Sequence, residues 1–98
     1  SKDVNQYAVQ IARSTRPETG DDFVKKFVHW GAGPRSSQFL SIGARVKAGI
    51  EGRSAATKAD VDYVAMSILQ HRIVKNFQAQ AAGISSQDII QHVLSELR

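Results

Sequence analysis

Residues 31–37, Gly-Ala-Gly-Pro-Arg-Ser-Ser, combine residue types that could bind an anion. Gly33 suits a helix cap, Pro34 suits the first helical position, and apolar periodicity begins at Phe39. The pattern predicts a helix with Arg35 in its first turn. Unpaired N–H groups and the positive end of the helix dipole disfavour a cation there by about 0.3–1 kcal/mol. A phosphate suits the same position, because backbone donors and a guanidinium can share one anionic ligand.

The candidate phosphate-binding residues are therefore Gly33, Pro34, Arg35 and Ser36. The alternative is that Arg35 bends away and pairs with a surface carboxylate, since short Gly-Pro-Arg segments are common. Ser36 and Ser37 have no neighbouring base, so we expect them to cap the helix rather than act as nucleophiles. The sequence contains no Gly-x-x-x-x-Gly-Lys-Ser/Thr segment, so this chain alone is not expected to bind ATP as P-loop proteins do.

Three histidines and nine carboxylates are the remaining candidates for acid–base or metal chemistry, and they form no motif. His29, His71 and His92 lack a metal-binding spacing such as His-x-x-x-His. We therefore expect capping, packing or solvent exposure for all three, and no metal site.

Basic residues gather around the end of the predicted helix that begins at Pro34; they are Arg45, Lys47, Arg53 and Lys58. With a net charge of +4, such a cluster permits an anionic partner such as a nucleic acid. Cations near a helix C-terminus also complement the helix dipole, and no segment concentrates the basic and amide side chains that contact base edges. A free-standing basic helical module that binds nucleic acid, or another protein, remains the alternative function.

Four amphipathic helices are predicted to position these residues, and they cover residues 3–14, 34–50, 57–71 and 85–97. The buried stripe of the second is predicted to comprise Phe39, Leu40, Gly43, Val46 and Ile50. Thr-x-x-Asp and Ser-x-x-Asp segments at Thr57 and Ser85 predict capped starts for the last two helices. Residues 75–84 are expected to form a loop.

Residues 21–30 fit both a short helix and a short strand. Very short strand pairings are expected near residues 28–30, 54–56 and Ile73. Trp30 is expected to pack in the core or against a helix rather than to stack on a nucleic-acid base. The fold class is accordingly all-α, a small four-helix domain that occupies residues 1–98.

The composition, with 42% hydrophobic and 22% charged residues, is typical of a soluble globular chain. No apolar run approaches the roughly 20 residues of a membrane span, and the first residues lack the apolar region of a signal peptide. The absence of cysteine excludes disulfides and thiolate metal sites and fits a reducing compartment. We expect a cytoplasmic location.

Residues 31–36 resemble the Gly-Ala-Ser-Pro-Arg-Ala segment that opens a helix in the C-terminal lid domain of MoxR-family AAA+ ATPases. Gly33 and Ser36 replace the serine and the alanine of that segment. Residues 12–17 are similar to the Thr-Arg-Pro end of the first lid helix, and residues 39–48 to its Leu-x-x-x-Ala-Arg-Ala helix. Residues 56–61 resemble the Val-Thr-Pro-Glu-Asp-Val turn, and residues 69–73 the Leu-Arg-His-Arg-Ile segment. The resemblance covers nearly the full chain, although residues 19–28 form a longer connection than expected.

The resemblance implies that Arg35 is a sensor 2 arginine, which assists hydrolysis at a nucleotide-binding core with Walker motifs outside this chain. ATP and Mg²⁺ would bind in the full-length protein, whereas this chain alone would bind neither and would be inactive. The implied partners are the chain's own core, neighbouring subunits of a hexameric ring and a client protein that is remodelled or matured by a chaperone-like activity, in bacteria or archaea. Arg16 and Arg72 also fall in family motifs, and we expect both to be structural, paired with carboxylates such as Asp60 or Asp62, or else to have an interface role.

Overall fold

The computed structural model describes residues 2–97, which form six helices and two short strands. In chain order the elements are α1 (Lys2–Ser14), α2 (Asp22–Phe27), β1 (Val28–Trp30), α3 (Ser36–Ile50), α4 (Lys58–Leu69), β2 (Val74–Lys75), α5 (Phe77–Ala82) and α6 (Ser86–Leu97). The predicted all-α class is confirmed, with two short helices in addition to the four expected. None of the helices in residues 2–97 is long and apolar enough to cross a membrane.

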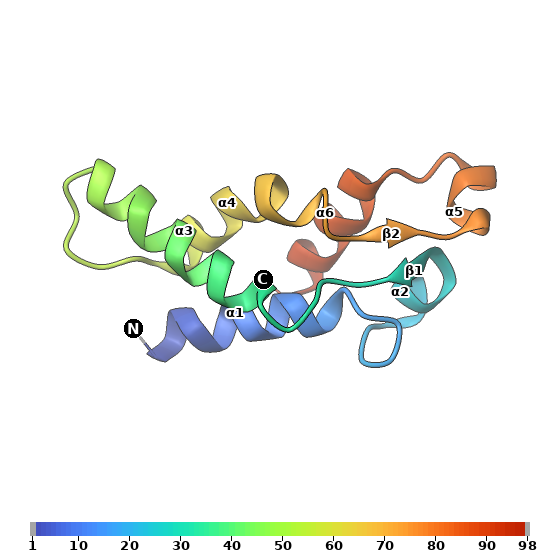
Figure 1. The fold of residues 1–98 in the computed structure, drawn as a ribbon, viewed down its shortest axis with the longest axis horizontal. Helices are drawn as coiled ribbons and strands as arrows, with labels where there is room; N and C mark the ends of the chain where they lie inside the picture. The colour runs from blue at the N-terminus through green and yellow to red at the C-terminus, as the bar shows by residue number, and fades with distance from the viewer. Residues whose placement is uncertain (1, 98) are drawn as a thin grey trace.

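The elements are arranged along an elongated body of 44 × 22 × 21 Å. Figure 1 shows α3 and α4 at one end of the long axis, and α2, the two strands and α5 at the other. Helix α1 packs against α3, α4 and α6, so one helix contacts the three other long helices of the domain.

The apolar faces predicted for the first and last helices are buried. In α1 they consist of Val4, Tyr7, Ala8, Ile11 and Ala12, and in α6 of Ile89, Ile90, Val93 and Leu94. Full burial of an isoleucine or leucine side chain stabilises a fold by about 1.5–3 kcal/mol. These two faces therefore contribute a large share of the apolar core, together with Val61, Ala65 and Leu69 of α4.

Helix α3 turns a different face inward from the one predicted. Its buried residues are Ser36, Leu40, Ser41, Ala44 and Ala48, whereas Val46 is 55% and Ile50 is 82% exposed. Small inward residues let α3 approach α1 and α4 closely. Gly43 also lies at such a contact, since an added Cβ would be 3.1 Å from Ile68 Cδ1. The predicted close packing of Gly43 is confirmed, but most of the predicted stripe is wrong.

Residues 21–30 form both of the elements that the sequence suggests, one after the other: helix α2 is followed directly by strand β1. Strand β1 pairs antiparallel with β2, with Val28 opposite Lys75 and Trp30 opposite Val74. Residues 54–56 form no strand. Trp30 is 64% exposed beside His29, so the expected interior packing of the indole is wrong.

The segment expected to be a loop at residues 75–84 contains helix α5. Asn76 caps its start by accepting a hydrogen bond from the Ala79 N–H, and Gly83 ends it at a left-handed φ of 73°. These are standard start and stop residues, so the caps could have indicated this short helix.

Candidate functional site

The arginine at the start of α3 occupies the N-cap position, immediately before Ser36. A turn precedes the helix, in which the Ser36 N–H donates to Gly33 O at 3.0 Å. The Gln38 N–H donates to Arg35 O at 3.1 Å, so part of the donor set at this terminus is already used. The helix thus begins two residues after the predicted start at Pro34, but Arg35 still lies at its N-terminus.

The candidate phosphate-binding residues differ in their exposure. Gly33, Pro34 and Arg35 are exposed, whereas Ser36 is buried beneath them. Gly33 does not adopt the left-handed conformation, which among the glycines of residues 2–97 occurs at Gly52 and Gly83. Within residues 2–97 the Arg35 guanidinium has no hydrogen bond or ion pair, so the alternative of a surface carboxylate partner is not realised in this part of the chain.

An open depression of about 550 Å³ lies at this helix start, and it is lined by Gly33, Pro34, Arg35, Ser36, Phe39 and Arg72. Phe39 is one turn beyond Arg35 on α3 and is 41% exposed. The guanidinium carbon of Arg72 lies 4.7 Å from the centre of the Phe39 ring, a cation–π contact. The fold therefore brings two arginines from distant parts of the chain to one depression.

The end of α1 holds the segment that carries Arg35. Arg16 Nε donates to Ala32 O at 2.7 Å, and the Ala32 N–H donates to Thr15 Oγ1 at 2.9 Å. Gly31 passes so close that an added Cβ would lie 2.5 Å from Thr15 O. The expected pairing of Arg16 and Arg72 with Asp60 or Asp62 is wrong: Arg16 bonds to a backbone carbonyl and Arg72 stacks on Phe39.

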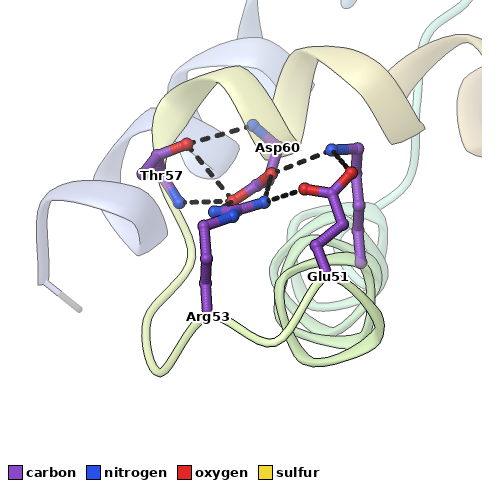
Figure 2. A network of polar contacts seen from close by, with 5 residues as sticks. Glu51, Arg53, Thr57 and Asp60 are labelled. Carbon is purple, nitrogen blue, oxygen red and sulfur yellow. Dashed lines mark hydrogen bonds and ion pairs between the residues drawn. The ribbon is translucent and has the colours of Figure 1, made fainter.

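A second polar cluster closes the connection between α3 and α4 (Figure 2). Arg53 forms a bidentate ion pair with Asp60, at 2.7 and 2.6 Å, and the Thr57 N–H donates to the same carboxylate at 2.8 Å. Asp60 is only 2% exposed. The Arg53 hydrogen bonds, followed by the Thr57 N–H bond, hold the pKa of Asp60 well below its usual range despite the opposing effect of burial. Thr57 and Asp60 also form the predicted capping box of α4.

This cluster uses much of the basic charge that favoured a nucleic-acid partner. Lys47 and Arg53 are both bonded to Glu51 and Asp60. Lys58 lies 5.5 Å over the ring of Tyr7. Within residues 2–97, the predicted basic cluster is thus largely neutralised or engaged in packing.

Three side chains with metal-ligand atoms meet where α2 and α6 approach; they are Asp21, His92 and Glu96. Their ligand atoms lie within 4.8 Å of one another, and His92 Nε2 is 2.7 Å from Asp21 Oδ2. Asp21 also caps α2 through Val24 N–H, and His92 stacks on Phe23. These contacts account for the arrangement without an ion. Sequence spacing did not indicate the group, although His92 and Glu96 are one helical turn apart.

The AAA lid domain family matches residues 21–93, which is most of the chain, and the chain belongs to this family. More particularly, it is 38% identical over 90 residues to Chaperone MoxR1 of Mycobacterium tuberculosis, a match that covers 90% of this chain and 24% of that protein. It is 26% identical over 95 residues to the uncharacterized protein YeaC of Bacillus subtilis, which covers 97% of this chain and 28% of YeaC.

A crystal structure of a protein from Cytophaga hutchinsonii, designated an ATPase, superimposes with a TM-score of 0.91 at 30% identity. That match covers 100% of this chain and 30% of the other. The comparisons confirm the resemblance to the lid domain of MoxR-type AAA+ ATPases. The chain spans about a quarter of the length of the curated relatives, at 24% and 28%.

Proposed function

We propose that this chain is the C-terminal lid of a MoxR-type AAA+ ATPase, and that Arg35 is its sensor 2 arginine. The observation that carries the proposal is the exposed Arg35 guanidinium, which has no ion pair within residues 2–97 and lies at the N-terminus of a 15-residue helix. A guanidinium and the positive end of a helix dipole both favour an anion at this place. The ligand would be the γ-phosphate of ATP held by a nucleotide-binding core outside this chain.

The donor set around Arg35 suits phosphate oxygens rather than a metal ion. No carboxylate lines the depression in the described part of the chain, so the Mg²⁺ that accompanies ATP would be held by the core. Bound ATP with Mg²⁺ supplies the phosphoryl group that is transferred to water. Arg35 would stabilise the charge that develops on this group, while residues 15–16 and 31–32 hold the turn that presents the guanidinium.

The lid would also couple hydrolysis to its partners through an apolar surface. Exposed apolar residues follow one side of α3 from the depression to the helix end; they are Phe39, Ile42, Val46 and Ile50. A continuous exposed stripe of this kind on a small domain indicates an interface. Since the stripe is continuous with the phosphate-facing depression through Phe39, the nucleotide-binding core is its proposed occupant. Movement of lid and core would then drive chaperone-like remodelling of a client protein by a ring of subunits in the bacterial cytoplasm.

The test is steady-state ATP hydrolysis by the full-length protein, with Arg35→Ala compared with wild type. We expect turnover to fall at least tenfold, because loss of an arginine that touches the transferred group costs roughly 10³–10⁵ in the best-studied cases and a sensor arginine less. Arg45→Ala is the matched control, since Arg45 is an exposed arginine on the same helix. Unchanged turnover and ATP affinity in Arg35→Ala would refute the sensor assignment.

A further inference from the structure

Arg72 is a second cation at the phosphate-facing depression, and the proposed function gives it no role. It follows α4 in a turn in which the Arg72 N–H donates to Leu69 O at 2.9 Å. Its backbone lies between two buried residues, Leu69 and Ile73. The position of the Arg72 backbone is therefore set by the core, although the side chain itself is exposed.

The ring of Phe39 holds the Arg72 guanidinium beside the start of α3. The guanidinium carbon lies 4.7 Å from the ring centre, within the range of an attractive cation–π contact. Phe39 stands four residues after Arg35, so the ring and Arg35 share one side of the helix. Stacking leaves the edge of a guanidinium free to donate hydrogen bonds.

Two arginines at one depression repel each other unless an anion lies between them. Within residues 2–97, Arg72 makes no ion pair, and no carboxylate lines the depression. The nearby helix terminus adds further positive potential. An anion with several charges, spread over more than one group, would satisfy both guanidiniums at once.

We propose that Arg72 is a second phosphate-binding residue of the lid, which contacts the polyphosphate of the nucleotide together with Arg35, and that Phe39 positions it. The inference rests on the proposed function, because it takes the same nucleotide as ligand. Arg72 follows the end of α4, whereas Arg35 precedes the start of α3. Arg35 would contact the polyphosphate from the start of α3, and Arg72 from the end of α4. One bound nucleotide would therefore contact both elements.

The experiment measures ATP and AMP affinities by calorimetry on the full-length protein, for Arg72→Ala, Arg72→Lys, Phe39→Leu and Phe39→Tyr. We expect Arg72→Ala to weaken ATP binding roughly tenfold, the usual effect of losing one hydrogen bond to a charged group, and to change AMP affinity much less. Arg72→Lys should recover only part of the loss, because lysine lacks the planar fork and its stacking. Phe39→Leu should lower ATP affinity less than Arg72→Ala does. Phe39→Tyr keeps the aromatic ring and should bind ATP as tightly as wild type.

The controls separate this inference from the proposed function. If Arg35→Ala lowers turnover while Arg72→Ala binds ATP as tightly as Arg45→Ala does, the Arg72 assignment is wrong and the sensor assignment stands. If Arg35→Ala has no effect, the proposed function itself fails. A change of subunit assembly in Arg72→Ala, with ATP affinity unchanged, would show that Arg72 pairs with a carboxylate of another subunit and would overturn the inference. Unaltered melting temperatures identify the variants that fold normally.

Discussion

The carboxylate of Asp60 is buried, and it forms ion pairs with Arg53 and Lys47. Asp60→Asn keeps the shape of the side chain but removes the buried one of the two carboxylates that these cations share. We expect a lower melting temperature in Asp60→Asn than in Glu51→Gln, the control that removes an exposed carboxylate from the same cluster. Thermal unfolding followed by circular dichroism measures both.

The same carboxylate gives the stability a defined pH dependence. The pKa of Asp60 is lowered in the folded state, so its contribution is fully present above the unfolded pKa of about 3.9 and is lost as the pH falls below it. We expect the decline in wild-type stability below about pH 4 to be shallower in Asp60→Asn. Urea unfolding of both proteins between pH 2 and 7, roughly the range in which carboxyl groups titrate, tests this. The same dependence of unfolding free energy on pH in wild type and Asp60→Asn would contradict it.

Two glycines near Arg35 have opposite steric surroundings. A Cβ at Gly31 would lie 2.5 Å from Thr15 O and 2.6 Å from Arg16 Cα, whereas one at Gly33 would meet nothing within 4 Å. Gly31→Ala must therefore displace backbone, at a cost of about 1–3 kcal/mol. Gly33→Ala should stay within about 0.5 kcal/mol of wild type. Urea denaturation compares the two variants, and equal stabilities would show that the backbone at Gly31 relaxes freely.

The orientation of α3 has a direct test at the level of the helix. Leu40 is fully buried and Ile50 is 82% exposed, although both belong to the stripe expected to be buried. Leu40→Ala should cost about 2–5 kcal/mol of unfolding free energy. Ile50→Lys should stay within about 0.5 kcal/mol of wild type in this chain. A strong destabilisation by Ile50→Lys, measured by urea denaturation, would mean that the helix is rotated from the observed orientation.

Helices with a single apolar face could be predicted from the sequence. In α1 and α6 bulky residues recur on one side only, so periodicity identifies the buried face. Helix α3 has one face of bulky apolar residues and one face of small residues. Which of the two is buried depends on how closely the neighbouring helices pack against α3. Helix α5 is six residues long with one buried residue, Ala79, which is too little for a periodic signal.

One part of the candidate site could likewise be predicted from the sequence, and another part could not. Local spacing placed Arg35 at a helix start, because Pro34 and the following apolar residues mark that start. The contacts of Arg72 with Phe39, and of Arg16 with Ala32, join segments far apart in the chain. They depend on how α1, α3 and α4 pack, which no local pattern contains.

Considered as a whole, the molecule presents Arg35, Arg72 and the apolar stripe of α3 on connected parts of one surface. The depression and the stripe share Phe39, so phosphate contact and apolar contact would be made by one body of the full-length protein. The chain spans only 24% and 28% of the length of its curated relatives, and under the proposed function this surface would contact the nucleotide-binding core. Under the proposed function, the lid domain would contribute binding surfaces, while the Walker chemistry would lie elsewhere.

The open space around Gly33 offers a place for a spectroscopic reporter. The chain contains no cysteine, so Gly33→Cys would introduce one thiol into it, two residues from Arg35. Nothing within 4 Å obstructs a side chain at this position, and the neighbouring turn is bonded to the end of α1. A spin label or fluorophore attached there would follow the rigid lid rather than a loose loop. Under the proposed function, its distance to a labelled nucleotide would record lid position during ATP hydrolysis by the full-length protein.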